Sequence, residues 1–474
     1  MDPRVTIIGG GLAGSEAARV LAAAGLGVDL HEMRPARPTP AHESGELAEI
    51  VCSNSLGSVA EGTSKGTLLE ELRRLGSLVV ATAEAHAVPA GASLAVDRTA
   101  FARAMTAAVE ALPGVTVHRD EVTALPDGPT IVATGPLTSD ALAESLRALT
   151  GGEHLAFYDA IAPIVTAESL DHDVLYAASR YGRGSPDFLN VPLSKEEYET
   201  FVASLVAADT VVPKDFEDVA VFEGCMPIEV MARRGPQTLA FGPMRPVGLP
   251  DPRTGRPPYA VIQLRREDRH GQLYNLVGFQ TRLRHGAQKE LFRTLPGMGG
   301  AAFVRLGSMH RNTFLNTPAL LDADLSLKAR PDLWFGGLLV GVEGYAECAA
   351  AGLVAALGVV ARLRGEAFEP PPETSMLGGL LAHLRGADPA HFQPMNVNFG
   401  LLPPVPRERV EGRGKKARRT ASSRRALEDM DTWIAARDLG WLGGAPSPAA
   451  TDDATDTAGS ESSVAPTDAA EGGA

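Results

Sequence analysis

The chain has 474 residues, of which 44% are hydrophobic, and a formal net charge of −14 at pH 7. This length and composition support a substantial core, spread over two domains or over one large domain with an insertion. The three cysteines, Cys52, Cys225 and Cys348, are far apart and form no C-x-x-C pair, so the sequence suggests neither a disulfide framework nor a zinc site, and no bound metal is expected.

The sequence shows no segment typical of a leader or of a membrane span. Its first apolar run begins almost at the initiator methionine, which leaves no room for a signal peptide. The longest apolar region, residues 334–363, is interrupted by Glu343, Glu347 and several glycines. We therefore expect a cytoplasmic protein.

Residues 5–16, VTIIGGGLAGSE, predict a dinucleotide-binding turn. An apolar, β-branched run over 5–8 is typical of a buried parallel strand, and Gly9, Gly11 and Gly14 then follow with the spacing G-x-G-x-x-G. The first glycine permits a tight turn, the second lets a pyrophosphate approach the backbone, and the third allows a helix to pack closely on the strand. A glycine-rich turn that merely packs is the alternative.

The continuation of the chain favours the dinucleotide interpretation. A helix is predicted over 15–24, and a second strand over 27–31 ends at Glu32. A carboxylate at this place accepts hydrogen bonds from the adenosine ribose hydroxyl groups, which indicates an unphosphorylated ribose, as in FAD or NAD. A turn that only packs leaves the position of Glu32 unexplained.

The following elements are predicted in chain order from periodicity and capping residues. They are a helix over 68–75, extended segments over 78–85 and 92–96, a helix over 97–112 capped by Asp97 or Thr99, and strands over 115–119 and 130–133. The last strand ends in Ala-Thr-Gly, a recurrent feature of flavoproteins with two dinucleotide folds. From about 158 to 318 the pattern becomes irregular and rich in proline, which predicts an inserted substrate domain.

The predicted nucleotide-binding domain resumes near residue 319. A strand-like run over 333–340 leads into Gly341-Val342-Glu343-Gly344-Tyr345 and an alanine-rich helix over 346–363. This turn resembles the closing FAD motif of glutathione-reductase-type flavoproteins, in which a helix N-terminus points at the flavin ring. It makes FAD the preferred dinucleotide, because NAD as the resident cofactor would leave the closing motif without a role.

The expected fold class is therefore α/β. A glutathione-reductase-like, FAD-binding Rossmann-type domain (1–157 and 319–444) would carry an inserted smaller α+β domain (158–318) and a tail (445–474). The tail is rich in Ala, Thr, Ser, Asp and Gly and contains no basic residue, so we expect it to be disordered.

Two of the cysteines lie in segments suited to chemistry. Cys52 follows a strand-like approach and precedes Ser-Asn-Ser, residues favoured at turns and helix caps, where backbone N–H groups favour a thiolate. Cys225 lies between Gly224 and Pro227, in a loop-like segment. The alternative for each is a small buried hydrophobic residue, and Cys348, inside the alanine-rich helix, is interpreted in that way.

Positive charge is concentrated just before the tail. The stretch 407–425 contains nine basic residues and two acids on an otherwise acidic chain, which is the pattern of a nucleic-acid footprint or of a solvated loop. The basic residues expected to contact phosphate groups are Arg407, Arg409, Arg413, Lys415, Lys416, Arg418 and Arg419.

Seven stretches together resemble one family. GLAGSEAA, HEMRP with TPAH, ELAEIVCSNSL, FEGCMPIE, NLVGFQTRLRHGAQKELFRTLPG, FVRLGSMHRNTFLNTP and FGGLLVGVEGYAECAAAGL are similar to the folate- and FAD-dependent tRNA (uracil-5-)-methyltransferases, the TrmFO family. The resemblance extends from Met1 to about Gly440. The beginning and the closing turn also resemble MnmG, a flavoprotein of wobble-uridine modification, whose chains are longer and carry a C-terminal helical domain.

The resemblance implies methylation of C5 of the T-loop uridine at tRNA position 54. The carbon would come from 5,10-methylenetetrahydrofolate and the electrons from FADH2, regenerated by NAD(P)H. Uracil C5 is a poor nucleophile until a thiolate adds to C6, and a base must later remove the C5 proton, so Cys52 and Cys225 can divide these duties in either order. The alternatives are an MnmG-like enzyme and an RNA-binding flavoprotein without turnover, although simple binding has no need of paired thiols.

The resemblance and the two glycine turns together give a set of expected FAD-binding residues. They are Gly9, Gly10, Gly11, Leu12, Ala13, Gly14, Glu32, Arg34, Thr134, Gly135, Gly341, Gly344 and Tyr345. Polar residues in two of these stretches, which either hold folate or flavin or satisfy local backbone groups, are Gln280, Arg282, Lys289, Arg311, Asn312 and Asn316. Asp97 and Arg98, in AVDR, match a flavoprotein segment near the cofactor, and a helix N-cap is the alternative for Asp97. The basic stretch is expected to dock tRNA, and no obligate protein partner is expected.

Overall fold

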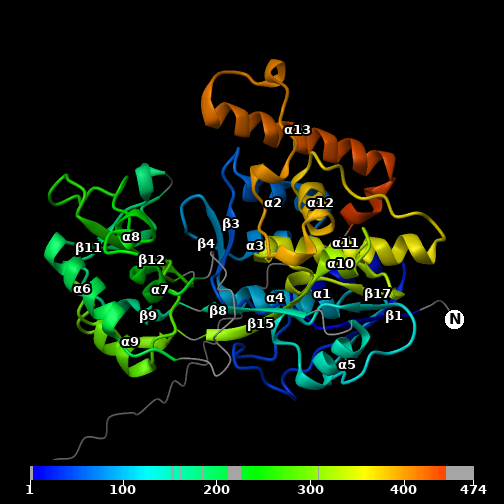
Figure 1. The fold of residues 1–474 in the computed structure, drawn as a ribbon, viewed down its shortest axis with the longest axis horizontal. Coiled ribbons are helices and arrows are strands. Elements are labelled where there is room, and N and C mark those ends of the chain that lie inside the picture. The colour runs from blue at the N-terminus through cyan, green and yellow to red at the C-terminus, as the bar shows by residue number, and fades with distance from the viewer. Residues whose placement is uncertain are drawn as a thin grey trace, which may run out of the picture.

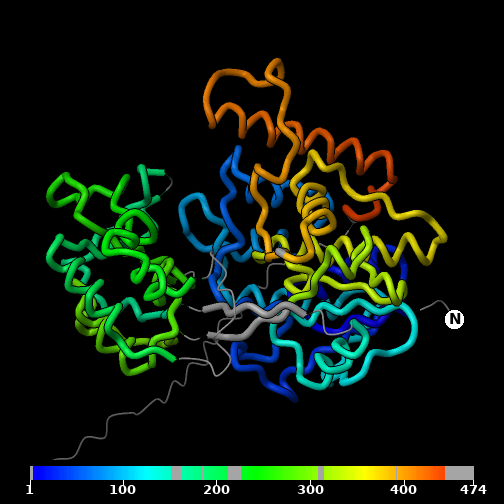
Figure 2. The backbone as a smooth tube through the Cα atoms, viewed as in Figure 1, coloured from blue at the N-terminus to red at the C-terminus, as the bar shows by residue number. Residues whose placement is uncertain are grey.

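The computed structural model describes residues 4–150, 154–160, 162–183, 185–211, 226–268, 270–307 and 309–444. The chain forms two bodies (Figures 1 and 2). The first body holds the blue, cyan, yellow and orange segments, and the second body, residues 162–307, holds the green ones. The predicted tail begins at 445 and lies outside the described residues.

The first body is built on a six-stranded sheet whose central strands are buried and apolar. In spatial order its strands are β16 (Ser326–Leu327), β17 (Arg330–Phe335), β7 (Thr130–Val132), β1 (Arg4–Ile8), β2 (Gly27–His31) and β6 (Val115–His118). All neighbours pair in parallel except β16 and β17. Helices cover both faces of this sheet (Figure 1), which confirms the predicted α/β class.

The register of this sheet brings four chain segments to one edge. Ile8 lies opposite both His31 and Val132, and Val132 in turn lies opposite Phe335. Because these strands are parallel, the residues that follow them emerge side by side at the carboxyl edge. Open α/β sheets bind ligands at this edge.

Helices α1 (Leu12–Ala23) and α11 (Tyr345–Leu363) pack against each other on the sheet. Within the part of the chain that the structure describes, α11 alone is long and apolar enough to cross a membrane, and 83% of that window is buried inside the protein, as in a core helix. The other helices are α2 (Ser64–Arg74), α3 (Leu78–Ala85), α4 (Arg98–Glu110), α5 (Asp140–Thr150), α10 (Thr317–Leu320), α12 (Met376–Gly386) and α13 (Gly414–Ala436). A small antiparallel sheet has the order β3 (Ser55–Ser58), β5 (Ser93–Val96) and β4 (Ala87–Val88).

The second body has its own antiparallel sheet and its own core. The sheet order is β10 (Tyr176–Ala177), β11 (Phe188–Leu193), β12 (Ala260–Arg266), β13 (Leu273–Leu276), β9 (Ile164–Thr166) and β14 (Phe303–Arg305). Its helices are α6 (Lys195–Ala207), α7 (Ile228–Arg233), α8 (Thr238–Phe241) and α9 (His285–Phe292). Strands β8 (His154–Ala160) and β15 (Met309–Leu315) pair antiparallel where the chain leaves and rejoins the first body. These strands fall near the ends of the predicted insertion at 158 and 318, and those domain limits stay a prediction.

The structure corrects two predicted elements. Residues 78–85, predicted as extended, form helix α3, whose first turn is capped by the Ser77 hydroxyl and by the buried carboxylate of Glu16. The strand-like run 333–340 is a strand only to Phe335, because Gly337 takes a positive φ of 71° and the chain then forms a 3-10 turn over Gly337–Val340.

Candidate active site

A cleft with about 1040 Å³ of empty space, counting its solvent-open mouth, lies along the carboxyl edge of the large sheet. Its walls come from the segments after β1, β2, β7 and β17, together with the start of α11. The expected cofactor residues that line it are Gly9, Gly11, Leu12, Ala13, Glu32, Arg34, Thr134, Gly135 and Tyr345.

The glycine turn leaves an open cradle in this cleft. A Cβ atom added to Gly9 would lie 2.6 Å from the Ala133 carbonyl oxygen, and one added to Gly14 would lie 1.9 Å from the Gly9 carbonyl oxygen. A Cβ added to Gly11 would meet nothing within 4 Å, and no side chain caps α1 at this residue. The first helical N–H groups therefore face open space, an arrangement that fits the pyrophosphate of a dinucleotide.

Glu32 supplies a buried carboxylate next to this cradle. It is 6% exposed, and it accepts hydrogen bonds from the Gly10 N–H at 3.1 Å and from Arg34 Nε at 2.9 Å. Burial would raise the pKa of Glu32, but the Arg34 guanidinium and these hydrogen bonds outweigh burial and lower it. An ionised acceptor at the end of β2 is suited to the hydroxyl groups of a ribose.

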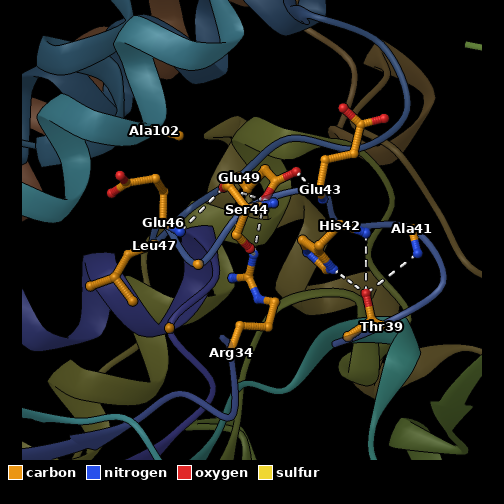
Figure 3. Close-up of polar contacts among 12 residues, drawn as sticks. Arg34, Thr39, Ala41, His42, Glu43, Ser44, Glu46, Leu47, Glu49 and Ala102 are labelled. Carbon is orange, nitrogen blue, oxygen red and sulfur yellow. Dashed lines mark hydrogen bonds and ion pairs between the residues drawn. The ribbon is translucent and has the colours of Figure 1, made fainter. Parts of the chain in front are cut away.

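The segment 39–49 folds over Arg34 and forms another wall of the cleft (Figure 3). Glu49 accepts a hydrogen bond from Arg34 at 3.0 Å, and Thr39 Oγ1 lies 2.6 Å from His42 Nδ1. Burial, assisted by the charge of Arg34, lowers the pKa of His42 to about 4, so its imidazole is neutral. The periodicity of the sequence gives no indication of the contacts within 39–49, and His42 appears in the sequence analysis only as part of the TPAH stretch.

The closing turn acts through its backbone. Gly341 and Gly344 have positive φ values of 79° and 109°, and Gly344 is the residue before the first turn of α11. A Cβ at Gly341 would lie 2.5 Å from the Phe392 ring. Of this turn only Tyr345 lines the cleft, and Gly10 and Gly14 likewise lie behind its surface.

Cys52 is joined to the cleft through Tyr345. The half-buried Cys52 donates its backbone N–H to the Tyr345 hydroxyl at 2.9 Å, and its carbonyl accepts a hydrogen bond from Arg98 at 2.7 Å. Asp97 caps α4, as predicted, by accepting a hydrogen bond from the Ala100 N–H. Cys225 lies outside the described residues.

Cys348 has the character expected of a buried hydrophobic residue. It lies inside α11 and borders the cleft, and burial raises the pKa of its thiol far above the ordinary value. Among the described residues, no group of three or more His, Cys, Asp or Glu side chains could hold a metal ion.

The polar residues of the other matching stretches lie elsewhere. Arg282 pairs with the buried carboxylate of Glu229 at 3.5 Å, and Lys289 is exposed on α9. Asn316 donates to the Pro389 carbonyl at 3.0 Å. Arg282, Lys289, Asn316 and Gln280 do not border the cleft. The side chains of Arg311 and Asn312 are not among those that the structure describes.

The basic stretch ends in helix α13, which runs along the outside of the first body (Figure 1). Arg419 stacks on the Phe399 ring at 6.0 Å, and Arg409 lies 3.4 Å from Glu428. The basic residues that are exposed and make no ion pair with a described residue are Arg407, Arg413, Lys415, Lys416, Arg418 and Arg419. These six positive charges, four of them on α13 and two just before it, are therefore available to phosphate groups.

Comparison with known proteins gives concordant matches. A family model described as Glucose inhibited division protein A matches residues 4–367. The methylenetetrahydrofolate--tRNA-(uracil-5-)-methyltransferase TrmFO of Syntrophotalea carbinolica is 54% identical over 435 residues, which cover 91% of this chain and 94% of that protein. The protein of the same name from Desulforudis audaxviator is 54% identical over 444 residues, which cover 93% and 100%.

Solved structures agree on the fold. The form I crystal structure of Aquifex aeolicus GidA superposes with a TM-score of 0.67 at 16% identity, covering 93% of this chain and 76% of that one. The form II crystal gives 0.66. At this identity the likeness supports the shared architecture only.

Proposed function

Because the chain belongs to the TrmFO family of methylenetetrahydrofolate--tRNA-(uracil-5-)-methyltransferases, within the wider group described as Glucose inhibited division protein A, we propose that it methylates C5 of a uridine in tRNA. The carbon comes from 5,10-methylenetetrahydrofolate, and the target is the T-loop uridine at position 54. The alternative, an MnmG-like (GidA-type) enzyme, shares the family model and the fold, but the TrmFO relatives are 54% identical and are spanned to 94% and 100%, whereas the GidA chain is 16% identical and is spanned to 76%.

The observation that carries this proposal is the hydrogen bond between Cys52 and Tyr345. It joins the thiol segment to the cleft whose cradle and carboxylate suit a dinucleotide. The residues that would hold FAD are those lining this cleft: the turn at Gly9 and Gly11 with the N-terminus of α1 at the pyrophosphate, and Glu32 at the ribose. When bound, FAD supplies reducing equivalents, which NAD(P)H regenerates.

The protein's own residues then activate the pyrimidine. One thiolate adds to C6 of uracil, which makes C5 nucleophilic, and after the one-carbon transfer a base removes the proton from C5. We assign these two roles to Cys52 and Cys225. For Cys52, Tyr345 and Arg98 hold the peptide groups on either side of the residue and so fix the position of its backbone beside the cleft.

The decisive experiment uses the purified protein and tRNA. We expect a yellow flavin spectrum, and transfer of label from methylenetetrahydrofolate to tRNA that depends on NAD(P)H. S-adenosylmethionine should give no transfer. A flavin-containing protein that transfers no carbon from the folate to tRNA would refute the proposal.

The roles of the thiols are tested by Cys52→Ala and Cys225→Ala. We expect each variant to lose methylation while it keeps wild-type flavin content and tRNA binding, because neither thiol is needed for the cradle or for the basic helix. Full methylation in either variant would remove that cysteine from the mechanism.

Docking of the tRNA T-arm is assigned in part to the basic stretch 407–419 and to the start of α13. The exposed cations described above form a positive strip on a chain of net charge −14, which suits a polyanion. We also propose a cytoplasmic location, where tRNA and the folate donor are available.

A further inference from the structure

The Cys52 loop is held between the two bodies by an arginine and an asparagine. Arg98, from the first body, donates to the carbonyl groups of Ile50 at 2.8 Å and of Cys52 at 2.7 Å, and it pairs through Nε with Glu267 of the second body. Asn54, also from the first body, donates from its Nδ2 to the Arg266 carbonyl of the second body at 2.9 Å. The thiol therefore lies at the junction of the two bodies.

Two more arginines reach this junction from the second body. Arg265 is 8% exposed and donates to the Ser53 hydroxyl at 2.8 Å, while its Nε has no partner. Arg305 donates to the Ala41 carbonyl at 3.0 Å, and the acid nearest to it, Glu43, is 3.9 Å away and 74% exposed. Glu267 pairs directly with Arg98 and acts on Arg265 only through space, so among the described residues neither Arg265 nor Arg305 has a buried carboxylate in contact with it.

A second buried donor lies beside Arg265. Asn275 is directly opposite Arg265 across the β12–β13 pair, so the two side chains share one face of the sheet, and Asn275 Nδ2 also has no partner. Glu267 Oε1, just after the end of β12, is a buried acceptor without a partner. Even with this carboxylate, the three guanidinium groups give the junction a net positive charge.

Burial makes this excess of charge unfavourable. It lowers the pKa of Arg265 and of Arg305, and the charge of Arg98 lowers both further, although Glu267 raises the pKa of Arg265 and Glu43 that of Arg305. The Cys52 thiol and the Tyr345 phenol act on both arginines in the opposite direction, since their ionised forms are negative. Each of these two arginines is thus repelled by Arg98, and a bound anion relieves such repulsion better than water can at a partly closed junction.

We propose that Arg265, with the Asn275 amide beside it, forms an anion subsite next to the Cys52 loop, with Arg305 contributing positive charge from the same junction. This subsite receives an anionic oxygen of the target nucleotide. This inference rests on the proposed function and extends it to residues of the second body. A uridine in folded RNA must leave its stack to reach a thiol at such a junction, and its phosphodiester group comes with it.

The anionic oxygen has two possible sources within the nucleotide. One is the phosphodiester group, which is charged before any reaction. The other is the pyrimidine ring: when the thiolate sulfur bonds to C6, the C5=C6 electron pair shifts toward C4 and leaves the charge on O4. In that case a guanidinium N–H donates a hydrogen bond to O4 and no proton leaves the arginine.

The test compares Arg265→Gln and Arg265→Lys with two matched controls. Arg256→Gln removes an exposed arginine of the same body, and Ser53→Ala removes the contact of Arg265 with the loop but keeps its charge. Flavin content, the tRNA Kd over a range of salt concentrations, and the single-turnover rate of methylation are measured for each variant. If Arg265→Gln does not fold, Arg305→Gln enters the same comparison.

A phosphodiester ligand predicts that Arg265→Gln weakens tRNA binding and reduces the salt slope by about 1. A ring oxygen predicts an unchanged Kd and a single-turnover rate lower by about 10²- to 10³-fold, partly restored in Arg265→Lys. The subsite is refuted if Kd and rate both match those of Arg256→Gln, if Ser53→Ala reproduces the whole effect, or if only flavin content changes. If the wild-type protein binds tRNA but does not methylate it, the proposed function fails. The ring oxygen then never becomes charged and only the phosphodiester source remains, so an equal tRNA Kd in wild type and Arg265→Gln refutes the subsite separately.

Discussion

Helices α1 and α11 approach so closely that a single methyl group at Gly352 should disturb the cofactor cleft. A Cβ at this position would lie 2.1 Å from the Ala13 carbonyl oxygen and 2.7 Å from the Ala13 Cα. The atoms involved are backbone atoms of a helix, so no side-chain rotation relieves the contact. Gly352→Ala therefore requires the two helices to separate by about 1 Å, an overpacking that costs roughly 1–3 kcal/mol.

This displacement acts directly on the cradle, because Leu12 and Ala13 line the cleft and begin α1. If the whole penalty falls on the cofactor-bound geometry, FAD affinity decreases by about 5- to 150-fold. We expect flavin content after purification to fall. Any part of the penalty that the flavin-free protein also carries lowers the thermal midpoint of the stripped protein and makes the loss of FAD affinity correspondingly smaller.

The assay is titration of the stripped protein with FAD, followed by flavin fluorescence, with Gly386→Ala as the matched control. Gly386 is the last residue of α12, and a Cβ there would meet nothing within 4 Å. This control should keep wild-type FAD affinity and be neutral or more stable by about 0.5–1 kcal/mol. Wild-type FAD affinity and stability in Gly352→Ala would show that the helix contact does not position the cradle.

Three further predictions follow from charge and burial. Changing four exposed cations of α13 to Gln should raise the KM for tRNA and weaken the salt dependence of tRNA binding, while the flavin content stays unchanged. The control Lys195→Gln, on the second body, should leave the KM for tRNA unchanged. An unchanged KM in the four-residue variant would contradict docking on α13. The four are Lys415, Lys416, Arg418 and Arg419. Since the pKa of His42 is lowered to about 4 in the folded state, the unfolded chain binds more protons at pH 4–6.5, so stability falls as pH drops through this window; His42→Gln should flatten that dependence in thermal unfolding, and an identical pH profile would contradict it. Glu347→Ala leaves the ammonium group of Lys65 and the N–H of Val397 without their acceptor, so it should lower the free energy of unfolding by about 3–5 kcal/mol. Glu347→Gln keeps an acceptor for the Val397 N–H, so chemical denaturation of this variant should show a smaller loss.

The sequence predicts well those elements whose structure depends on residues close together in the chain. The strand over 5–8, the three glycines and Glu32 form one continuous unit, and the structure has β1, the turn, α1 and β2 in that order. Helix α3 was predicted wrongly because its stretch LVVATAEA is rich in β-branched and small residues. Its first turn depends on Glu16, which accepts the Val79 N–H from another part of the chain.

The second body illustrates what sequence patterns leave out. Arg265 and Arg305 lie at strand ends in an irregular region, and nothing in their spacing relates them to Cys52 some 200 residues earlier. Their proximity comes from the way β12 and β14 meet the first body, which is decided by tertiary packing. Buried donors without a partner are visible only after the strands are placed.

The peptide groups around Cys52 are held both by a motif that the sequence predicts and by a contact that only the tertiary structure shows. The Cys52 N–H is held by the first residue of α11, whose N-terminus faces the cleft, and the Cys52 carbonyl is held by the first residue of α4, which is paired with Glu267 of the second body. A displacement of α11 and a displacement of the second body at Glu267 would therefore both reach Cys52 through its backbone hydrogen bonds. The Cys52 backbone therefore keeps its place only when both bodies hold theirs, and under the proposed function this would align the thiol with the cofactor and the RNA base together.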